Sequence, residues 1–432
     1  MENMAIADQI IQRQDKDGML RRALERIIQL YTDKSHFVYE LLQNAEDAGA
    51  TRIEFYQYEN RLEVLHNGHP FTRENLQGLC DIGKSDKIND LNKIGEFGVG
   101  FKSVFGICET VKVYSHPRDD NNDNSYQRFA VEIIDFTRPV DIEDVEFSDD
   151  FTTKFVFPYS VGYSFSGFET IKNLNAGISK RLMNLGINTL LFMKNLQSIY
   201  YSIETAAITT AGTYELEKVI INDHCSLITA LGSSGKSKEN PVYYLVFSRN
   251  VSGVQSDRTI DIAISMRKAE GGGYIYQPTN HPFISVFFPT ETESKLKFIV
   301  QGPYRTTPNR SSVPADDKDN LSLANQTTEL LRDSFLELRD NKMLNFSLLN
   351  LLPLEEKAFD NAPLFKCIYE KSVEMLKSDG ILHCKDGTFT TADHVKLARG
   401  NEFAEVLNES LLTELINDGK DYHWLTLETV NK

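Results

Sequence analysis

The sequence contains no hydrophobic run long enough to cross a membrane. Its longest apolar stretches, such as 243–247, have the length of a β-strand, whereas a membrane-spanning helix needs about 20 apolar residues. No basic segment followed by an apolar one opens the chain, so we predict no secretory signal. The five cysteines are scattered, and no pair has metal-ligand spacing. Reduced, mostly buried thiols in a cytoplasmic protein are therefore expected.

Basic residues are also in short supply. Lysine and arginine number 46 against 62 aspartates and glutamates, which gives a net charge of −16. Such a chain is not drawn to nucleic acid by its overall field, so direct nucleic-acid binding is not expected, although a local basic groove stays open. The 432 residues, 41% hydrophobic and 25% charged, show no internal repeat. These figures match a globular protein of two or three domains.

The first part of the chain alternates between helical and strand-like patterns. Apolar residues at helical spacing run from Leu20 to Tyr31, a second helix is predicted over 36–48, and a polar, glycine-rich loop over 79–100. Helices on one side of an antiparallel sheet make an α+β layer fold, which we assign to residues 1–165. The strands are predicted at 51–58, 61–66, 111–115, 126–135 and 153–157.

Two further regions are predicted after this domain. Residues 166–318 form a second α+β domain, and residues 319–432 form a helical region with a β-hairpin. Pro363 suits the first turn of a helix, and Asp386-Gly387 suits a hairpin turn. The strands of the second domain are predicted at 198–203, 213–221, 242–249 and 259–267, with a pair at 283–289 and 297–301.

Chemistry-bearing residues concentrate first in the helix over 36–48. Glu40, Asn44 and Asp47 are spaced i, i+4 and i+7, so they share one helix face. Ordinary amphipathic helices carry such polar stripes too, and the stripe alone does not decide between a site and a solvated face.

A second segment carries Gly95, Gly98 and Gly100 at the start of a predicted helix. Backbone N–H groups of glycines at a helix N-terminus can approach phosphate oxygens without obstruction by a Cβ atom. The segment is neither a Walker A loop nor a Rossmann fingerprint. Taken alone, it fits a simple turn equally well.

The two segments together, in this order and separated by a two-strand unit, resemble the N-box and second glycine box of the GHKL superfamily, which includes heat-shock-protein-90-type chaperones. Residues 151–158 resemble the family's late strand, with Thr153 at its threonine position. Residues 41–50, 66–71, 285–290 and 307–313 are similar to the sacsin-like branch. The resemblance implies a Bergerat-type ATP-binding sandwich with ATP and Mg²⁺ as cofactors.

Roles follow residue by residue from this resemblance. It implies that Glu40 is the general base that activates water and that Asn44 holds Mg²⁺. Asp47 would lie near the nucleotide, or only on the helix surface. Arg310 would reach the γ-phosphate from the second domain, or serve as a structural loop arginine. The loop 79–97 would act as a lid.

The phosphates would be bound around the second glycine box. The resemblance places Gly95, Gly98, Val99, Gly100 and Phe101 at the phosphates. Lys84, Ser85 and Lys102 are placed to meet phosphate charge, with a solvated surface as the alternative for both lysines.

One position departs from the family pattern. The first glycine box normally begins with an aspartate that accepts a hydrogen bond from the adenine amino group, and here His66 stands there, followed by Asn67 and Gly68. A neutral imidazole nitrogen, Asn67 or a water could accept that bond, or His66 could merely cap the strand. The departure puts base selectivity in doubt.

The leading hypothesis is a Mg²⁺-dependent, slowly hydrolysing ATPase that switches a lid and a second domain, as chaperone-like machines do. A nucleotide-gated protein-interaction scaffold without useful turnover is the alternative, as is an ATPase subunit of a nucleic-acid-processing or defence system. The expected partners are ATP and a protein partner or client, with a homodimer left open and no membrane.

Overall fold

The computed structural model describes residues 35–80, 100–118, 126–163, 166–205, 208–235, 237–252, 258–280, 282–307, 312–398 and 401–426. The chain divides into two compact units. The first comprises residues 1–217 and 229–241, and the second comprises 218–228 and 242–432. The three-part division at residues 165 and 318 stays a prediction. The helix expected at 20–31 lies outside the described residues.

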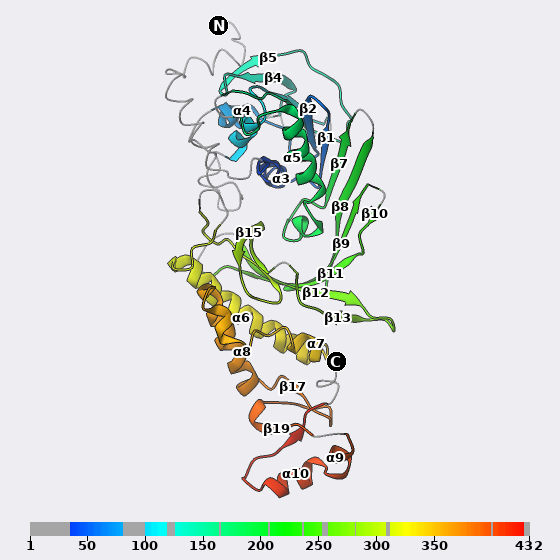
Figure 1. Cartoon of the computed structure of the whole chain (residues 1–432), viewed down its shortest axis with the longest axis vertical. Coiled ribbons are helices and arrows are strands. Elements are labelled where there is room, and N and C mark those ends of the chain that lie inside the picture. The colour runs from blue at the N-terminus through cyan, green and yellow to red at the C-terminus, as the bar shows by residue number, and fades with distance from the viewer. Residues whose placement is uncertain are drawn as a thin grey trace. The chain divides into compact units, whose positions relative to one another are not determined.

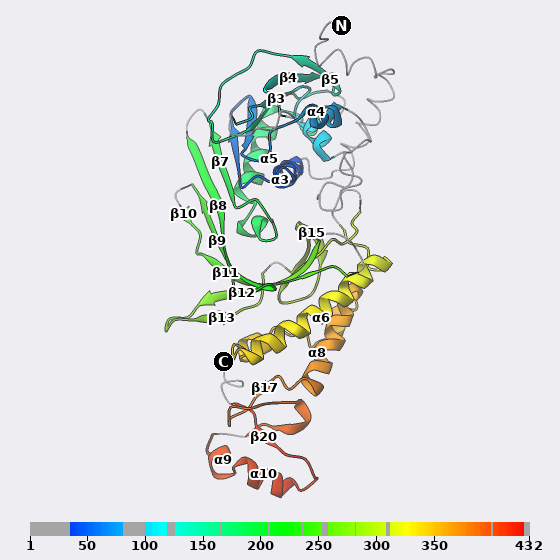
Figure 2. The same ribbon diagram turned by 180° about the vertical axis from the view of Figure 1, so that it is seen from behind.

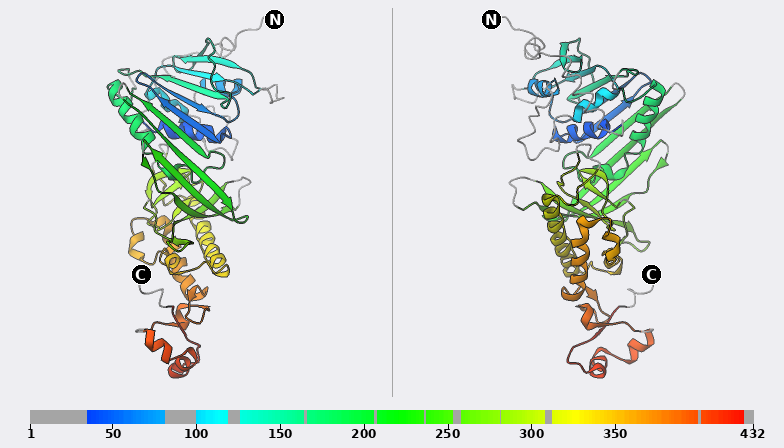
Figure 3. Two further views of the ribbon diagram at one scale, coloured as in Figure 1. Left: turned by 90° about the vertical axis from the view of Figure 1, so that its right-hand side faces the viewer. Right: turned by 60° about the vertical axis from the view of Figure 1, so that its left-hand side comes forward.

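A broad sheet forms the body of the first unit (Figure 3). Its strands follow the order β9-β8-β7-β1-β2-β6-β3-β4-β5, with the short β10 beside β9. β1 and β7 run parallel, with Phe55 opposite Tyr201, whereas β1 and β2 are antiparallel. The sheet is therefore mixed. The strands are β1 (Arg52–Gln57), β2 (Arg61–His66), β3 (Val111–Ser115), β4 (Phe129–Ile134), β5 (Arg138–Asp141), β6 (Thr153–Pro158), β7 (Ser198–Glu204), β8 (Thr209–Ile220), β9 (Cys225–Ser234) and β10 (Ser237–Lys238).

Helices lie beside β1 and β7 of this sheet (Figures 1 and 2). The predicted helix over 36–48 is confirmed as α3, and Gly49 follows it with a φ of 69°, the left-handed conformation that ends many helices. Thr170 caps the N-terminus of α5, where its hydroxyl accepts the Asn173 N–H. The helices are α3 (Phe37–Asp47), α4 (Arg73–Cys80) and α5 (Ile171–Met183), with 3₁₀ turns η1 (Gly100–Gly106) and η2 (Ile187–Leu190).

Hydrogen bonds fix α5 to the sheet. The Gln57 side chain on β1 donates to the main-chain and side-chain oxygens of Asn175, both at 2.9 Å, and accepts from the Ser179 hydroxyl at 3.1 Å. Residues alternate between the two faces of a strand, so Ile53 and Phe55 share the face of Gln57. His66 and Thr153 lie opposite each other on β2 and β6, and His66 pairs with Ile53 across β1 and β2. The face that carries α5 therefore also carries His66 and Thr153.

The second unit has its own strands, ordered β15-β14-β16-β12-β11, with β13 beside β12. The run at 283–289, predicted as one strand, is two: Phe287 has a φ of 63°, and the chain reverses there into a hairpin. β16 then pairs with β14 in parallel. The strands are β11 (Val242–Asn250), β12 (Thr259–Lys268), β13 (Tyr274–Tyr276), β14 (Phe283–Val286), β15 (Phe288–Glu293) and β16 (Ile299–Gln301).

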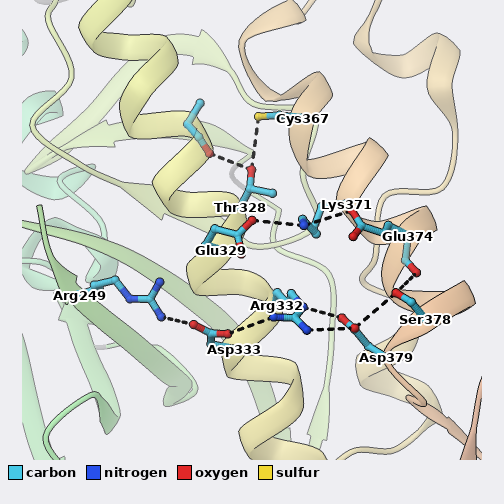
Figure 4. Close-up of polar contacts among 11 residues, drawn as sticks. Arg249, Thr328, Glu329, Arg332, Asp333, Cys367, Lys371, Glu374, Ser378 and Asp379 are labelled. Atoms are coloured by element: carbon cyan, nitrogen blue, oxygen red, sulfur yellow. Dashed lines mark hydrogen bonds and ion pairs between the residues drawn. The ribbon is translucent and has the colours of Figure 1, made fainter. Parts of the chain in front are cut away.

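Two helices of the second unit are joined by polar contacts (Figure 4). The Arg332 guanidinium on α6 donates two hydrogen bonds to the Asp379 carboxylate after α8, at 2.8 and 3.1 Å. The Lys371 ammonium on α8 lies 3.3 Å from Glu329 on α6. The helices are α6 (Lys318–Asp340), α7 (Phe346–Leu349) and α8 (Lys366–Ser378), with 3₁₀ turns η3 (Glu356–Phe359) and η4 (Pro363–Phe365).

The last described residues form short elements. The hairpin predicted at Asp386-Gly387 is confirmed, with Gly387 at a φ of 84° in the turn. The elements are β17 (Leu382–His383), β18 (Phe389–Thr390), η5 (Ala392–His394), β19 (Val395–Lys396), α9 (Asn401–Val406), α10 (Glu409–Ile416) and β20 (His423–Trp424).

The α+β prediction is confirmed: a large mixed sheet is combined with helices. The five cysteines are free thiols, four of them buried. None of the helices in the described part of the chain is long and apolar enough to cross a membrane.

Candidate functional site

The site begins where α3 meets η1. The Glu40 side chain is buried, and its carboxylate lies directly against Gly100, the first residue of η1. A Cβ atom built on Gly100 would fall 1.8 Å from Glu40 Oε2, so any other residue there would displace the carboxylate from this position. His36 Nε2, one helical turn earlier, lies 3.4 Å from Glu40 Oε1. The two segments singled out in the sequence are therefore in contact.

Asn44 and Asp47 continue the helix face that Glu40 begins. Both are half-buried residues of α3, one and two turns beyond Glu40. The structure brings Glu40, Asn44 and Asp47 together on one helix, as the spacing predicted. Their proposed duties toward a metal ion or nucleotide stay predictions.

Glu46 was not predicted from the sequence as a site residue, and in the structure it anchors a distant loop. It is buried, and its carboxylate accepts hydrogen bonds from three consecutive backbone amides: Lys194 at 2.9 Å, Asn195 at 3.0 Å and Leu196 at 2.8 Å. A signal was present in the sequence. Glu46 follows the apolar positions 38 and 42 at steps of four, so a charge stands on the buried face of the helix.

His66 ends β2 and is buried, with 3% of its surface exposed. Its Nδ1 accepts a hydrogen bond from the Gly68 amide at 3.3 Å, and its ring lies 6.3 Å from the ring of Phe155. Burial lowers the pKa of His66 from 6.5 to about 4, because a charged imidazolium is poorly solvated there. At neutral pH the ring is therefore uncharged.

Acid is expected to destabilise the protein through His66. The unfolded imidazole titrates near pH 6.5 and the folded one near 4. Between these values the unfolded chain binds more protons, so the free energy of unfolding falls as the pH is lowered. The expected loss at pH 5 relative to pH 7 is about 2 kcal/mol, measured by denaturant unfolding.

A comparison of variants isolates this contribution. His66→Asn keeps an acceptor for the Gly68 amide but cannot titrate, so its stability should change less between pH 7 and pH 5. His224→Asn, at an exposed position, is the control and should behave as the wild type does. If His66→Asn loses as much stability in acid as the wild type, the destabilisation has another source.

Thr153 lies opposite His66 and is fully buried. Its Oγ1 has no hydrogen-bond partner within the described residues. Leaving a buried hydroxyl unsatisfied costs about 1–3 kcal/mol. Such an atom calls for a polar group of a ligand or a water beside it.

Asn67 and Gly68 hold the end of β2 against its neighbours. The Asn67 side-chain oxygen accepts the Thr51 and Arg52 amides, both at 2.9 Å. A Cβ atom on Gly68 would lie 2.6 Å from the Ala48 carbonyl oxygen, directly after α3. Asn67 and Gly68 are therefore in close contact with backbone groups of neighbouring residues. Their contact with a nucleotide stays a prediction.

Lys102 is not a surface residue, so the solvated alternative is wrong for this position. It is 1% exposed, and its ammonium donates to the carbonyl oxygens of Leu79 and Phe136. A buried lysine is rare without such partners. Phe101 beside it is buried, with its ring 5.7 Å from that of Phe155. Their predicted contact with phosphate is not tested by these positions.

Several predicted site residues lie outside the described part of the chain, as does most of the predicted lid over 79–97. They are Lys84, Ser85, Gly95, Gly98, Val99 and Arg310.

Comparisons with known proteins bear on the same segments. Residues 18–121 match the family model described as the Sacsin domain. Human sacsin is 32% identical over 109 residues, which cover 21% of this chain and 2% of sacsin. The Chaperone protein HtpG of Vibrio atlanticus (strain LGP32) is 28% identical over 148 residues, covering 27% of this chain and 23% of HtpG. Residues 18–121 are thus a match to the sacsin domain, and the likeness to sacsin and HtpG indicates a domain of the GHKL, heat-shock-protein-90-like ATPase type.

A longer likeness extends beyond the sacsin domain. The protein NO VEIN of Arabidopsis thaliana is 26% identical over 339 residues, which cover 74% of this chain and 12% of that protein. The chain thus spans less than a quarter of the length of each of these relatives. Within the sacsin domain lie Glu40, Asn44, His66 and Gly100, whereas Thr153 lies after it.

Proposed function

We propose that this chain binds Mg·ATP and hydrolyses it slowly, and that nucleotide binding closes a lid and reorients the second domain in a sacsin-like, chaperone-like switch. The observation that carries the proposal is the Glu40 carboxylate packed against the α-carbon of Gly100. This contact puts the candidate base beside the last glycine of the segment, where η1 begins. The likeness to sacsin and HtpG supports ATP as the ligand.

The residues present fit a nucleotide and a metal ion. Gly100 has no side chain to obstruct a phosphate, and Thr153 has a buried hydroxyl in need of a polar partner. Asn44 would hold Mg²⁺ through its amide oxygen, one turn from Glu40, with phosphate oxygens and water as the other ligands, as Mg²⁺ usually requires. The bound ion would supply charge stabilisation at the transferring phosphoryl group. These residues support a Bergerat-type site.

Glu40 would act as general base. Its burial beside the glycine segment holds the carboxylate in a fixed position, and a carboxylate within hydrogen-bond reach of a water molecule can take its proton. Gly95, Gly98 and Gly100 would bind the phosphates through backbone N–H groups. His66 and Thr153 would face the base.

Asn44→Ala is expected to weaken Mg·ATP binding about tenfold or more, because it removes an oxygen ligand of the ion. Metal-free ATP should bind both proteins with similar, lower affinity. Isothermal calorimetry measures both, with Asn325→Ala, an exposed position of α6, as control.

The outcomes separate the candidate functions. Equal Mg·ATP affinity for wild type and Asn44→Ala would show that Asn44 does not bind the metal ion. A wild-type protein that binds no nucleotide would favour the alternative function, a protein-interaction scaffold without turnover. That alternative is motivated by His66, which replaces the expected aspartate. A protein client or a second copy of the chain would then be the ligand to seek.

A further inference from the structure

The hydrogen bond between Gly68 and His66 fixes which ring nitrogen of His66 carries the proton. A backbone amide can only donate, so Nδ1, which accepts from Gly68 at 3.3 Å, has no hydrogen. Because the buried ring is neutral at pH 7, its one proton is on Nε2. Position 66 therefore offers a hydrogen-bond donor at Nε2, and no described residue accepts from it.

A second polar group without a described partner lies beside it. Thr153 is the register partner of His66 across β2 and β6, and directly opposed side chains on one face have Cβ atoms about 5 Å apart. Its Oγ1 is fully buried and unsatisfied within the described residues. A hydroxyl both donates and accepts. The pair therefore fits a ligand edge with an acceptor next to a donor or a second acceptor.

We propose that His66 reads the base through this donor, so that the site binds 6-oxopurine triphosphates, GTP and ITP, at least as tightly as ATP. The inference rests on the proposed function, which places the base of the nucleotide at His66. The 6-oxo oxygen accepts from Nε2–H, and N1–H of the same base donates to Thr153 Oγ1. Adenine held in the same position presents its 6-amino hydrogens to Nε2–H, and two donors facing each other leave both unsatisfied. Adenine satisfies both groups only after a shift that lets its N1 accept from Nε2–H and its 6-amino group donate to Thr153 Oγ1, so ATP gains no advantage over GTP and ITP.

The test is equilibrium binding of Mg·ATP, Mg·GTP and Mg·ITP to wild type and to His66→Asp. ITP lacks the 2-amino group of GTP, so it reports on the 6-position alone. We expect wild type to bind GTP and ITP no more weakly than ATP. A carboxylate at position 66 accepts from the 6-amino group and repels the 6-oxo oxygen, so His66→Asp should shift the affinity ratio toward ATP by about tenfold or more.

Each result is decisive for one of the two claims. Preference of the wild type for ATP over both GTP and ITP by tenfold would overturn the inference and leave the proposed function standing. An affinity ratio that His66→Asp does not change would do the same, since position 66 would then not read the base. No binding of any of the three nucleotides would remove the proposed function itself.

A measurement without nucleotide or substitution guards against a variant that folds poorly. Protein labelled with ¹⁵N at its nine histidines gives two-bond correlations that show which ring nitrogen is protonated. We expect one buried neutral ring whose pattern persists down to about pH 5 and whose proton is on Nε2. A buried neutral ring protonated on Nδ1 would contradict the proposal, because Nε2 would then be an acceptor for the adenine amino group.

Discussion

Replacing Glu40 by glutamine is expected to reduce ATP turnover by about 100- to 10,000-fold while Mg·ATP binding stays within a few-fold of wild type. Glutamine has nearly the same shape as glutamate, so it fills the space beside Gly100. It cannot take a proton from water, so only the chemical step is affected. Steady-state phosphate release measures turnover, and calorimetry measures binding.

Controls distinguish a lost base from a disturbed helix. Glu59→Gln, at the exposed turn between β1 and β2, should leave both turnover and binding unchanged. Glu40→Ala should also bind and fail to hydrolyse. If Glu40→Gln turns over ATP at the wild-type rate, Glu40 is not the base and another residue must be sought.

Replacing Glu46 by alanine is expected to lower the free energy of unfolding by about 2–4 kcal/mol. The wild-type carboxylate accepts the amides of three consecutive residues, at 2.8 to 3.0 Å, and its removal leaves them without an acceptor. The segment 194–196 would then lose its attachment to α3. Denaturant unfolding, followed by circular dichroism, measures the change.

The neighbouring residue gives a matched comparison. Asp47 is only half-buried, so Asp47→Ala should cost less than about 1 kcal/mol. Glu46→Gln should fall between the two, since an amide oxygen still accepts but carries no charge. If Glu46→Ala is no more destabilising than Asp47→Ala, the three hydrogen bonds do not hold this segment in solution.

Local patterns made parts of this structure predictable. The helical spacing of apolar residues and the position of Gly49 predicted α3 and the face that carries Glu40, Asn44 and Asp47. The alternation of apolar and polar residues predicted β1 and β2. The α+β class followed from the order of these elements. Each of these features depends on residues within a few positions of one another, which a sequence displays directly.

Features that depend on distant residues were not predictable. The partners of Glu46 lie as far as 150 residues away along the chain. Lys102 resembles a surface or phosphate-binding residue until the carbonyl groups of Leu79 and Phe136 are placed around it. The turn at Phe287 was missed because a left-handed conformation at a phenylalanine has no sequence signal.

The tautomer of His66 is a further case. The sequence left open whether the imidazole accepts, donates or caps the strand. The Gly68 amide, two residues later, determines which ring nitrogen of His66 accepts and which carries the proton. Only the path of the backbone after β2 shows that this amide donates to Nδ1.

The parallel pairing of β1 with β7 has a consequence for how the protein is made. Chains are synthesised at about 5–20 residues per second, so the stretch between α3 and its contacts near residue 195 takes roughly 7 to 30 seconds to emerge. During that time β1 is complete but has an open edge, the kind of surface that other chains pair with. A fragment ending at residue 121, where the sacsin match stops, would keep that edge open permanently. The sacsin match thus ends at residue 121, whereas the open edge of β1 is paired only after β7, at residues 198–204, has been made.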